Sequence, residues 1–160
     1  MKKIIATNPN NFAALAARLA LGIAIFPHGA QKLLGLFGGY GFTGTMGFLT
    51  GQAHLPYILA LLVILIEFFG SLFLIFGLLT RISAFSFIAL FLGVVFTSHL
   101  QNGFFMNWTG GQKGEGFEYF ILLFGLAIVL LITGGGKASI DAAITEAPAL
   151  NGEGRVQLPR

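Results

Sequence analysis

One carboxylate, Glu67, lies inside the apolar run 56–79, with no other charged residue within eleven positions on either side. A helix rises about 1.5 Å per residue, so a run of this length crosses the roughly 30 Å hydrocarbon core of a bilayer. Glu67 should then sit near the middle of the membrane, where ionisable groups are costly and usually face a bundle interior. We expect it to be half of an internal ion pair or a proton-handling acid.

Three basic side chains lie on the first apolar run, and two of them, Arg18 and His28, could pair with that carboxylate. His28 and Lys32 are spaced i, i+4 and share one face of a helix, and Arg18 lies nearer the N-terminal end of the same run. Counting helical rise from the ends of the runs places both Arg18 and His28 within roughly 10 Å of Glu67 along the membrane normal. An Arg18–Glu67 clasp is one interpretation, and the sequence leaves open which of Arg18 and His28 neighbours the acid.

Three further candidate site residues, His99, Glu115 and Glu118, lie where the third apolar run ends and the fourth begins. His99 ends the third apolar run, although on an ideal helix it points away from the small residues of that run, which are Ser83, Ser86, Gly93 and Thr97. Glu115 and Glu118 precede the fourth run, where acids also interact favourably with a helix dipole. The Glu-x-x-His pairs of di-iron bundles are missing, so we expect no metal site.

Positioning these groups requires membrane-spanning helices, and the composition predicts them. Charged residues make up 9% of the chain and apolar residues 56%, against a soluble average of about 25% charged. The long apolar runs are 12–36, 56–79, 82–100 and 117–133. We therefore predict an all-α fold, an integral membrane four-helix bundle, with an N-terminal tail over 1–11, the bundle over 12–136 and a C-terminal segment over 137–160 that is disordered from Pro148.

The basic residues predict the orientation of the bundle. One face would carry most of them, namely Lys2, Lys3, Arg81, Lys137, Arg155 and Arg160. The other face would carry only Lys32 and Lys113. Bases concentrate on the cytoplasmic side of membranes, which predicts that both termini are cytoplasmic and that the protein is a multi-pass protein of the plasma (inner) membrane. The excess of bases thus has a membrane explanation, and we expect no nucleic-acid partner.

Two outer connections, 37–55 and 101–116, are rich in glycine and aromatic residues. Residues 39–44 match the dinucleotide fingerprint G-x-G-x-x-G, but no predicted strand precedes them, so we do not expect nucleotide binding. These glycines favour instead a compact loop that folds onto the mouth of the bundle. The chain contains no cysteine, so any thiol chemistry must belong to a partner or a substrate.

From Arg18 to Asp141 the chain resembles the DoxX family of small four-span membrane proteins. The resemblance rests on an ordered set of short pieces: Arg18, His28-Gly29, Lys32-Leu33, Gly35, Gly38-Gly39, Gly41, Gly44, Glu67, Gly70, Gly77, Thr80-Arg81, Asn102-Gly103-Phe104-Phe105, Gly114-Glu115-Gly116, Glu118-Tyr119, Gly134, Gly136, Ser139 and Asp141. Some members of the family look like membrane subunits of a thiosulfate:quinone oxidoreductase, and others are associated with membrane complexes that manage oxidative and thiol stress.

The resemblance implies a membrane oxidoreductase subunit that binds a quinone-type head group in the outer half of the bundle. In that hypothesis His28 and Lys32 hydrogen-bond a quinone oxygen, Glu67 or Glu118 relays a proton and Arg18 sets the charge state of Glu67. His99 and Glu115 complete the candidate binding residues. The bilayer and a redox partner or a second copy of the chain are the expected partners. The alternatives are a non-enzymatic membrane anchor or assembly factor and a small proton-coupled transporter.

Overall fold

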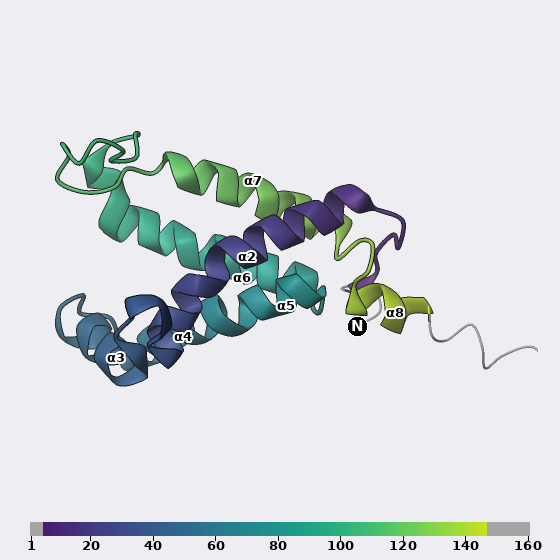
Figure 1. Ribbon diagram of the computed structural model, residues 1–160, viewed down its shortest axis with the longest axis horizontal. Helices are drawn as coiled ribbons and strands as arrows, with labels where there is room; N and C mark the ends of the chain where they lie inside the picture. The colour runs from purple at the N-terminus through teal and green to yellow at the C-terminus, as the bar shows by residue number, and fades with distance from the viewer. Residues whose placement is uncertain (1–4, 147–160) are drawn as a thin grey trace, which may run out of the picture.

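A computed structural model describes residues 5–146, all of whose regular elements are helical (Figure 1). In chain order the elements are α2 (Phe12–Leu34), η1 (Leu36–Gly38), α3 (Gly41–Gly51), α4 (Tyr57–Leu65), η2 (Ile66–Gly70), α5 (Ser71–Phe76), α6 (Thr80–Val94), η3 (Val95–His99), η4 (Leu100–Asn102), α7 (Glu118–Thr133) and α8 (Ile140–Glu146). Elements η2 and η3 are single π-helical turns, whereas η1 and η4 are 3₁₀ turns.

Four helical rods form the bundle, which confirms the predicted fold. Three of them are long and apolar enough to cross a membrane: Phe12–Leu34, Tyr57–Phe76 and Thr80–Asn102. The fourth, α7, is an apolar helix of 16 residues. The chain is therefore a multi-pass integral membrane protein. The segment from Pro148, expected to be disordered, lies outside the described residues.

Local signals set the ends of the rods. The Asn11 side chain accepts a hydrogen bond of 3.0 Å from the Ala14 amide and caps the start of α2. Gly35 ends α2 and Gly77 ends α5, each with a positive φ, of 74° and 68° respectively. This left-handed conformation is the one that closes many helices and that glycine adopts without strain. α2 continues through Pro27 as one helix.

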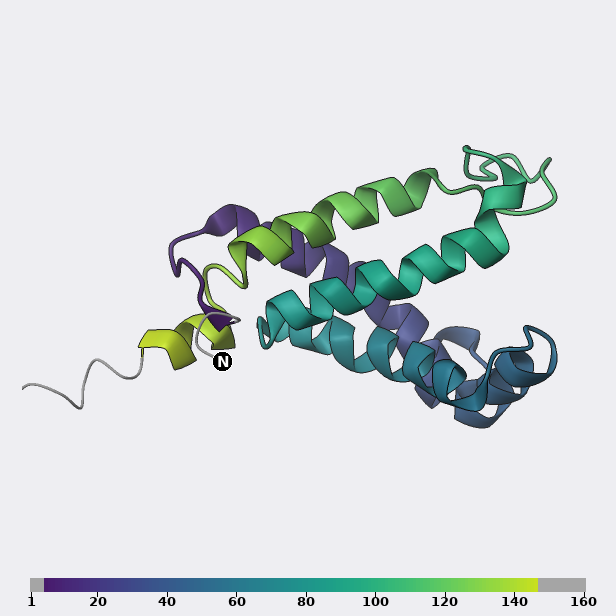
Figure 2. The same ribbon diagram turned by 180° about the vertical axis from the view of Figure 1, so that it is seen from behind.

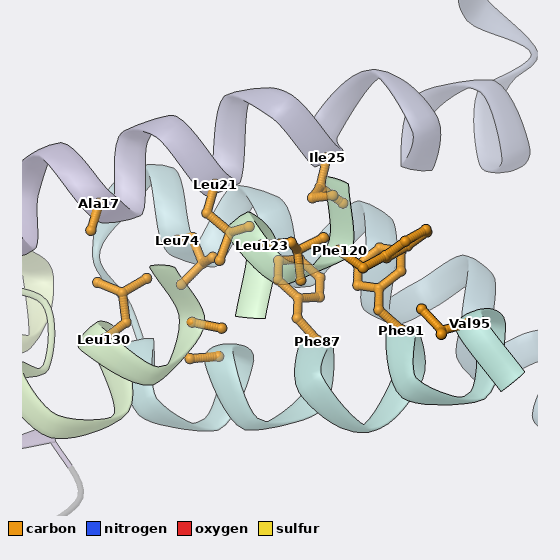
Figure 3. Close-up of a cluster of buried hydrophobic side chains, with 12 residues drawn as sticks. Ala17, Leu21, Ile25, Leu74, Phe87, Phe91, Val95, Phe120, Leu123 and Leu130 are labelled. Carbon is orange, nitrogen blue, oxygen red and sulfur yellow. The ribbon is translucent and has the colours of Figure 1, made fainter. Parts of the chain in front are cut away.

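All four rods contribute to one apolar core (Figure 3). Its buried side chains come from α2 (Ala17, Leu21, Ile25), α5 (Leu74), α6 and η3 (Ala84, Phe87, Phe91, Val95) and α7 (Phe120, Leu123, Ala127, Leu130). The small-residue stripe expected on the third rod is only partly packed, since Ser83 is buried but Gly93 has open space around it and Thr97 is exposed. The larger side chains Phe87, Phe91 and Val95 form the packed face instead.

Both ends of the described chain lie at one end of the bundle, which we name the terminal end (Figure 1). There Arg18, only 1% exposed, donates hydrogen bonds to the carbonyls of Leu74, Ile75, Gly135, Lys137 and Ala138. The Asp141 carboxylate, also 1% exposed, accepts from the amides of Leu79 (2.8 Å) and Thr80 (2.9 Å) and so caps α6. Arg18 and Asp141 thus fasten the segment after α7 to the rest of the bundle.

At the opposite end, the loop end, the rods separate into two groups (Figure 2). α6, α7 and the loop 103–117 lie on one side, and α3 and α4 lie on the other. The connection expected to be a loop over 37–55 contains the helix α3, whose buried Met46 packs with Ala60 and Ile64 of α4. This packing overrides the poor helix propensity of its glycines. The connection does fold onto the bundle mouth.

Candidate functional site

A cavity of about 700 Å³ lies between the two groups of helices at the loop end. Its walls are mostly apolar, and they come from every rod and both loop-end connections: Ile25, His28, Lys32, Phe48, Leu49, Ala53, Leu55, Val63, Glu67, Phe91, Val94, Thr97, Ser98, His99, Met106, Glu115, Tyr119 and Phe120. Cavities of this size that combine apolar walls with a few polar groups are typical of small-molecule sites. Five of the predicted site residues line it: His28, Lys32, Glu67, His99 and Glu115.

The strongest polar feature of the cavity is an ion pair between Lys32 of α2 and Glu67 of η2. The Lys32 Nζ atom lies 2.5 Å from Glu67 Oε2. The glutamate side chain is 4% exposed, whereas the lysine side chain is 28% exposed. Because a buried carboxylate without a cation is strongly unfavourable, Lys32 stabilises the acid where it stands. The cation beside Glu67 is therefore Lys32, neither Arg18 nor His28.

Glu67 occupies the π-helical turn η2, between α4 and α5. A π-turn contains one extra residue, which rotates the remainder of the helix by about 100° relative to a straight α-helix, and such turns occur often at functional sites. Helical spacing places Glu67, Gly70, Ser71, Leu74 and Gly77 on one face, a small-residue stripe of the second rod, and all five are nevertheless buried. The π-turn thus presents the carboxylate to Lys32 without exposing the small-residue stripe.

Gly29 allows α2 to approach this π-turn closely. A Cβ atom at Gly29 would lie 2.5 Å from the Phe68 nitrogen and 2.6 Å from the Glu67 carbonyl carbon. Backbone atoms cannot move aside as a flexible side chain can, so only glycine fits at this contact. Gly29 stands three residues before Lys32, and the close approach that it permits sets the distance between the two charged side chains. Sequence reasoning included Gly29 in the family resemblance but assigned it no role.

Replacing Gly29 with alanine is expected to separate α2 from η2. Overpacking of this kind typically destabilises a protein by about 1–3 kcal/mol. The matched control is Gly125→Ala on α7, where an added Cβ meets nothing within 4 Å. That control should be neutral or gain up to about 1 kcal/mol, because alanine is the better helix former. Denaturant titration of both variants in mixed micelles measures the difference, and equal midpoints would contradict the close contact.

His99 lies in the cavity wall that α6, η3 and α7 form. Its ring lies 4.7 Å from the Phe120 ring, centroid to centroid, and its Nδ1 lies 2.9 Å from the Glu115 carbonyl oxygen. A carbonyl oxygen only accepts, so Nδ1 carries the hydrogen and the lone pair of the neutral imidazole is on Nε2. The π-turn η3 ends at His99. His99 therefore presents an acceptor nitrogen on a cavity wall.

His28 and Glu115 contribute in different ways. His28 is exposed and lines the cavity one helical turn before Lys32. The Glu115 carboxylate accepts a 2.6 Å hydrogen bond from the Asn107 amide, and its carbonyl also accepts from Asn102 Nδ2 at 3.0 Å. Glu115 thus orders the loop 103–117 and orients His99 through its carbonyl, while its side chain is committed to the loop.

The two remaining predicted site residues are not among the cavity lining residues. Glu118 accepts hydrogen bonds of 3.1 Å from both the Met106 amide and the Trp108 indole. Arg18 binds the carbonyls of the terminal end rather than the Glu67 carboxylate. Arg18 does not pair with the acid because its donors are engaged by carbonyls at the C-terminal end of α5 and in the segment after α7.

Several lining residues carry no sequence signal of their own. Among them are Phe48 of α3, Phe91 of α6 and Phe120 of α7, and composition cannot single them out in a chain with 18 phenylalanines. Their convergence depends on how the rods pack. Among residues 5–146, no group of three or more histidine, cysteine, aspartate or glutamate side chains is arranged to hold a metal ion.

Comparison with known proteins agrees with this architecture. The family profile described as DoxX matches residues 13–100, which include α2, the whole second rod and both π-turns. A protein of Bacillus subtilis (strain 168) named "Putative oxidoreductase CatD" is 32% identical over 127 residues, which cover 79% of this chain and 83% of the relative. No solved structure matches the chain. The matched span and the similarity to this relative show that the protein is a member of the DoxX family.

Proposed function

We propose that this DoxX protein is a membrane subunit of an oxidoreductase system that binds a quinone-type head group in the loop-end cavity and handles its protons. The observation that supports the proposal most directly is the Lys32–Glu67 pair, which opens into a largely apolar cavity whose other wall carries His99. The distribution of basic residues along the sequence favours a protein of the plasma membrane whose two termini lie in the cytoplasm.

The cavity lining fits a planar ring with oxygen substituents. The rings of Phe48, Phe91 and Phe120 line the cavity and supply aromatic and apolar surface on more than one side. Aromatic pairs favour stacked or edge-on contacts, which hold a planar ring without fixing its substituents. Polar groups are few, as is usual in ligand sites, and they lie on separate helices, where they can orient the ring.

Each polar residue has a distinct role in this proposal. The Lys32 ammonium is a donor only and suits a carbonyl oxygen, whereas the Nε2 lone pair of His99 suits a hydroxyl group. Glu67 accepts the proton that Lys32 or the hydroquinone form of the ligand releases, because the Lys32 ammonium already donates a hydrogen bond to its carboxylate. His28 is exposed on the cavity wall. Its role in this proposal is to pass protons between the Lys32–Glu67 pair and the outside of the cavity.

A bound quinone-type ring supplies two-electron and two-proton redox chemistry. The chain's own residues position the ring and exchange the protons, and a redox partner protein or a cofactor held by such a partner supplies or removes the electrons. The similarity to a relative named as an oxidoreductase supports this class of activity over a purely structural anchor. The lack of any cysteine fits a subunit that does not carry sulfur covalently.

The test is a binding titration of purified protein in nanodiscs with a tailless benzoquinone and its hydroquinone. His99→Phe keeps the aromatic contact with Phe120 but removes the acceptor, so it should weaken hydroquinone binding by roughly two- to tenfold and leave the quinone nearly unchanged. The control is His54→Asn, since His54 is exposed, lies outside the cavity and has a φ of 53° that asparagine tolerates.

Equal loss for both redox forms in His99→Phe would contradict the assigned acceptor role. Absence of binding of either form to the wild-type protein would overturn the proposed function and favour the anchor hypothesis. Loss of binding in His54→Asn as well would show that the measured site is not the loop-end cavity.

A further inference from the structure

A second hollow, which we name the α7 groove, runs along the first turns of α7 beside the loop 103–117. It has a volume of about 420 Å³ and is lined by Phe104, Met106, Trp108, Glu118, Tyr119, Ile121 and Leu122. Ile121 and Leu122 are exposed on the outer face of a membrane-spanning helix, so the groove opens toward the acyl chains. The sequence alone gives no indication of this groove.

Two donors of the groove hydrogen-bond the same carboxylate oxygen. The Trp108 indole donates to Glu118 Oε1 at 3.1 Å, and the Met106 amide donates to the same oxygen at 3.1 Å. These bonds hold the indole against the start of α7 and leave mainly carbon surface to face an occupant. An apolar chain in the groove therefore keeps the Trp108 indole and the Met106 amide paired.

The groove and the cavity are neighbours, because Met106 and Tyr119 line both. Tyr119 is followed by Phe120, which is buried in the core and lines the cavity, while Ile121 and Leu122 belong to the groove. The first turn of α7 thus connects the two spaces. Methionine is unbranched and flexible, so it adapts its shape readily to a ligand that passes beside it.

We propose that the α7 groove binds the apolar tail of the ligand whose head group occupies the loop-end cavity. This inference rests on the proposed function and adds the route by which the tail leaves the cavity. The tail passes between Met106 and Tyr119, lies against Trp108 and Leu122 and continues into the lipid. The chemical class of the occupant is an isoprenoid or alkyl chain attached to a quinone-type ring.

Trp108 provides the readout, because it is the single tryptophan of the chain and it lines the groove. The experiment records its fluorescence in nanodiscs with three ligands: a tailless benzoquinone, the same ring with a plain alkyl tail, and the same ring with a brominated tail. Bromine quenches only at short range. The brominated tail should quench Trp108 more than the plain tail does, and an excess of the tailless ring should remove that additional quenching.

Two matched substitutions on α7 test the position of the tail. Leu122→Phe narrows the groove and should abolish the bromine-dependent quenching while tailless-ring binding is kept. Ile132→Phe makes the same kind of change at a residue that is equally exposed, 73% against 71%, but lies outside the groove, and it should have no effect.

The outcomes separate the two proposals. If the tailless ring binds but bromine-dependent quenching is absent, is not displaced by that ring, or equals the quenching from brominated phospholipid alone, the tail lies in bulk lipid and the groove proposal is overturned. If the brominated tail quenches Trp108 equally in Leu122→Phe and Ile132→Phe, the groove proposal is overturned as well. If the tailless ring itself does not bind, the proposed function fails.

Discussion

Lys32→Met should lose most ligand binding and destabilise the protein by about 3–5 kcal/mol, the usual cost of removing one partner of a buried ion pair. The substitution leaves the Glu67 carboxylate, 4% exposed, without its cation in a membrane-embedded site. Methionine retains most of the lysine stem, so little packing is lost. Denaturant titration in mixed micelles measures stability, and the nanodisc titration measures binding.

Two further variants separate the charge effect from the ligand effect. Lys113→Met removes an exposed lysine of the loop 103–117 and should change stability by less than about 0.5 kcal/mol. The double change Lys32→Met with Glu67→Leu removes both charges and should restore much of the stability but none of the binding. Wild-type stability in the single Lys32→Met variant would contradict the pair as described.

Arg18→Leu should have the largest effect on the fold, a loss of more than about 4 kcal/mol or a failure to accumulate folded protein. It removes the donors of five hydrogen bonds to the carbonyls of Leu74, Ile75, Gly135, Lys137 and Ala138. It also places an apolar side chain among these carbonyl groups, and each buried carbonyl that is left without a partner costs about 1–3 kcal/mol. The measurement is the unfolding midpoint together with the yield of monodisperse protein.

Arg18→Lys separates the contribution of the guanidinium hydrogen bonds to stability from the contribution of the positive charge. Lysine has three donors and cannot reproduce five bonds. The stability of the Arg18→Lys variant should therefore fall between that of the wild type and that of Arg18→Leu. Ligand affinity per folded molecule should be unchanged, because Arg18 does not line the cavity. A selective loss of affinity in a fully stable Arg18→Lys variant would instead favour a role beside Glu67.

The rods could be predicted from the sequence because apolar length determines membrane crossing more directly than any local propensity. The run 12–36 corresponds to α2 (Phe12–Leu34), and the run 117–133 corresponds to α7 (Glu118–Thr133). α3 could not be predicted in the same way, since its glycines weaken the helical signal and its formation depends on packing of Met46 against α4.

Five of the seven residues predicted for the site lie at the cavity, Arg18 and Glu118 do not line it, and the pairing within it could not be predicted. His28, Lys32, Glu67, His99 and Glu115 do meet at one cavity. Their pairing depends on two π-turns and on the close approach at Gly29, neither of which has a reliable signal in a single sequence.

The position of Arg18 illustrates a second limit. Its partners are more than fifty residues away along the chain, at the end of α5 and in the segment after α7. A rise count along one helix gives depth in the membrane but not rotation about the axis, so it left Arg18 and His28 open as neighbours of Glu67 and did not identify Lys32. Only the packed bundle assigns one base to the carboxylate and the other to the terminal end.

The most direct test of the central claim is the identity of the small molecules that leave with the purified protein, read by native mass spectrometry and a visible absorption spectrum. The wild-type chain should carry a quinone-type molecule in stoichiometric amount, and the Lys32→Met, Glu67→Leu double variant should carry none while remaining folded. A wild-type protein that carries no such molecule and takes up none when it is supplied, or a double variant that retains as much, would contradict the account.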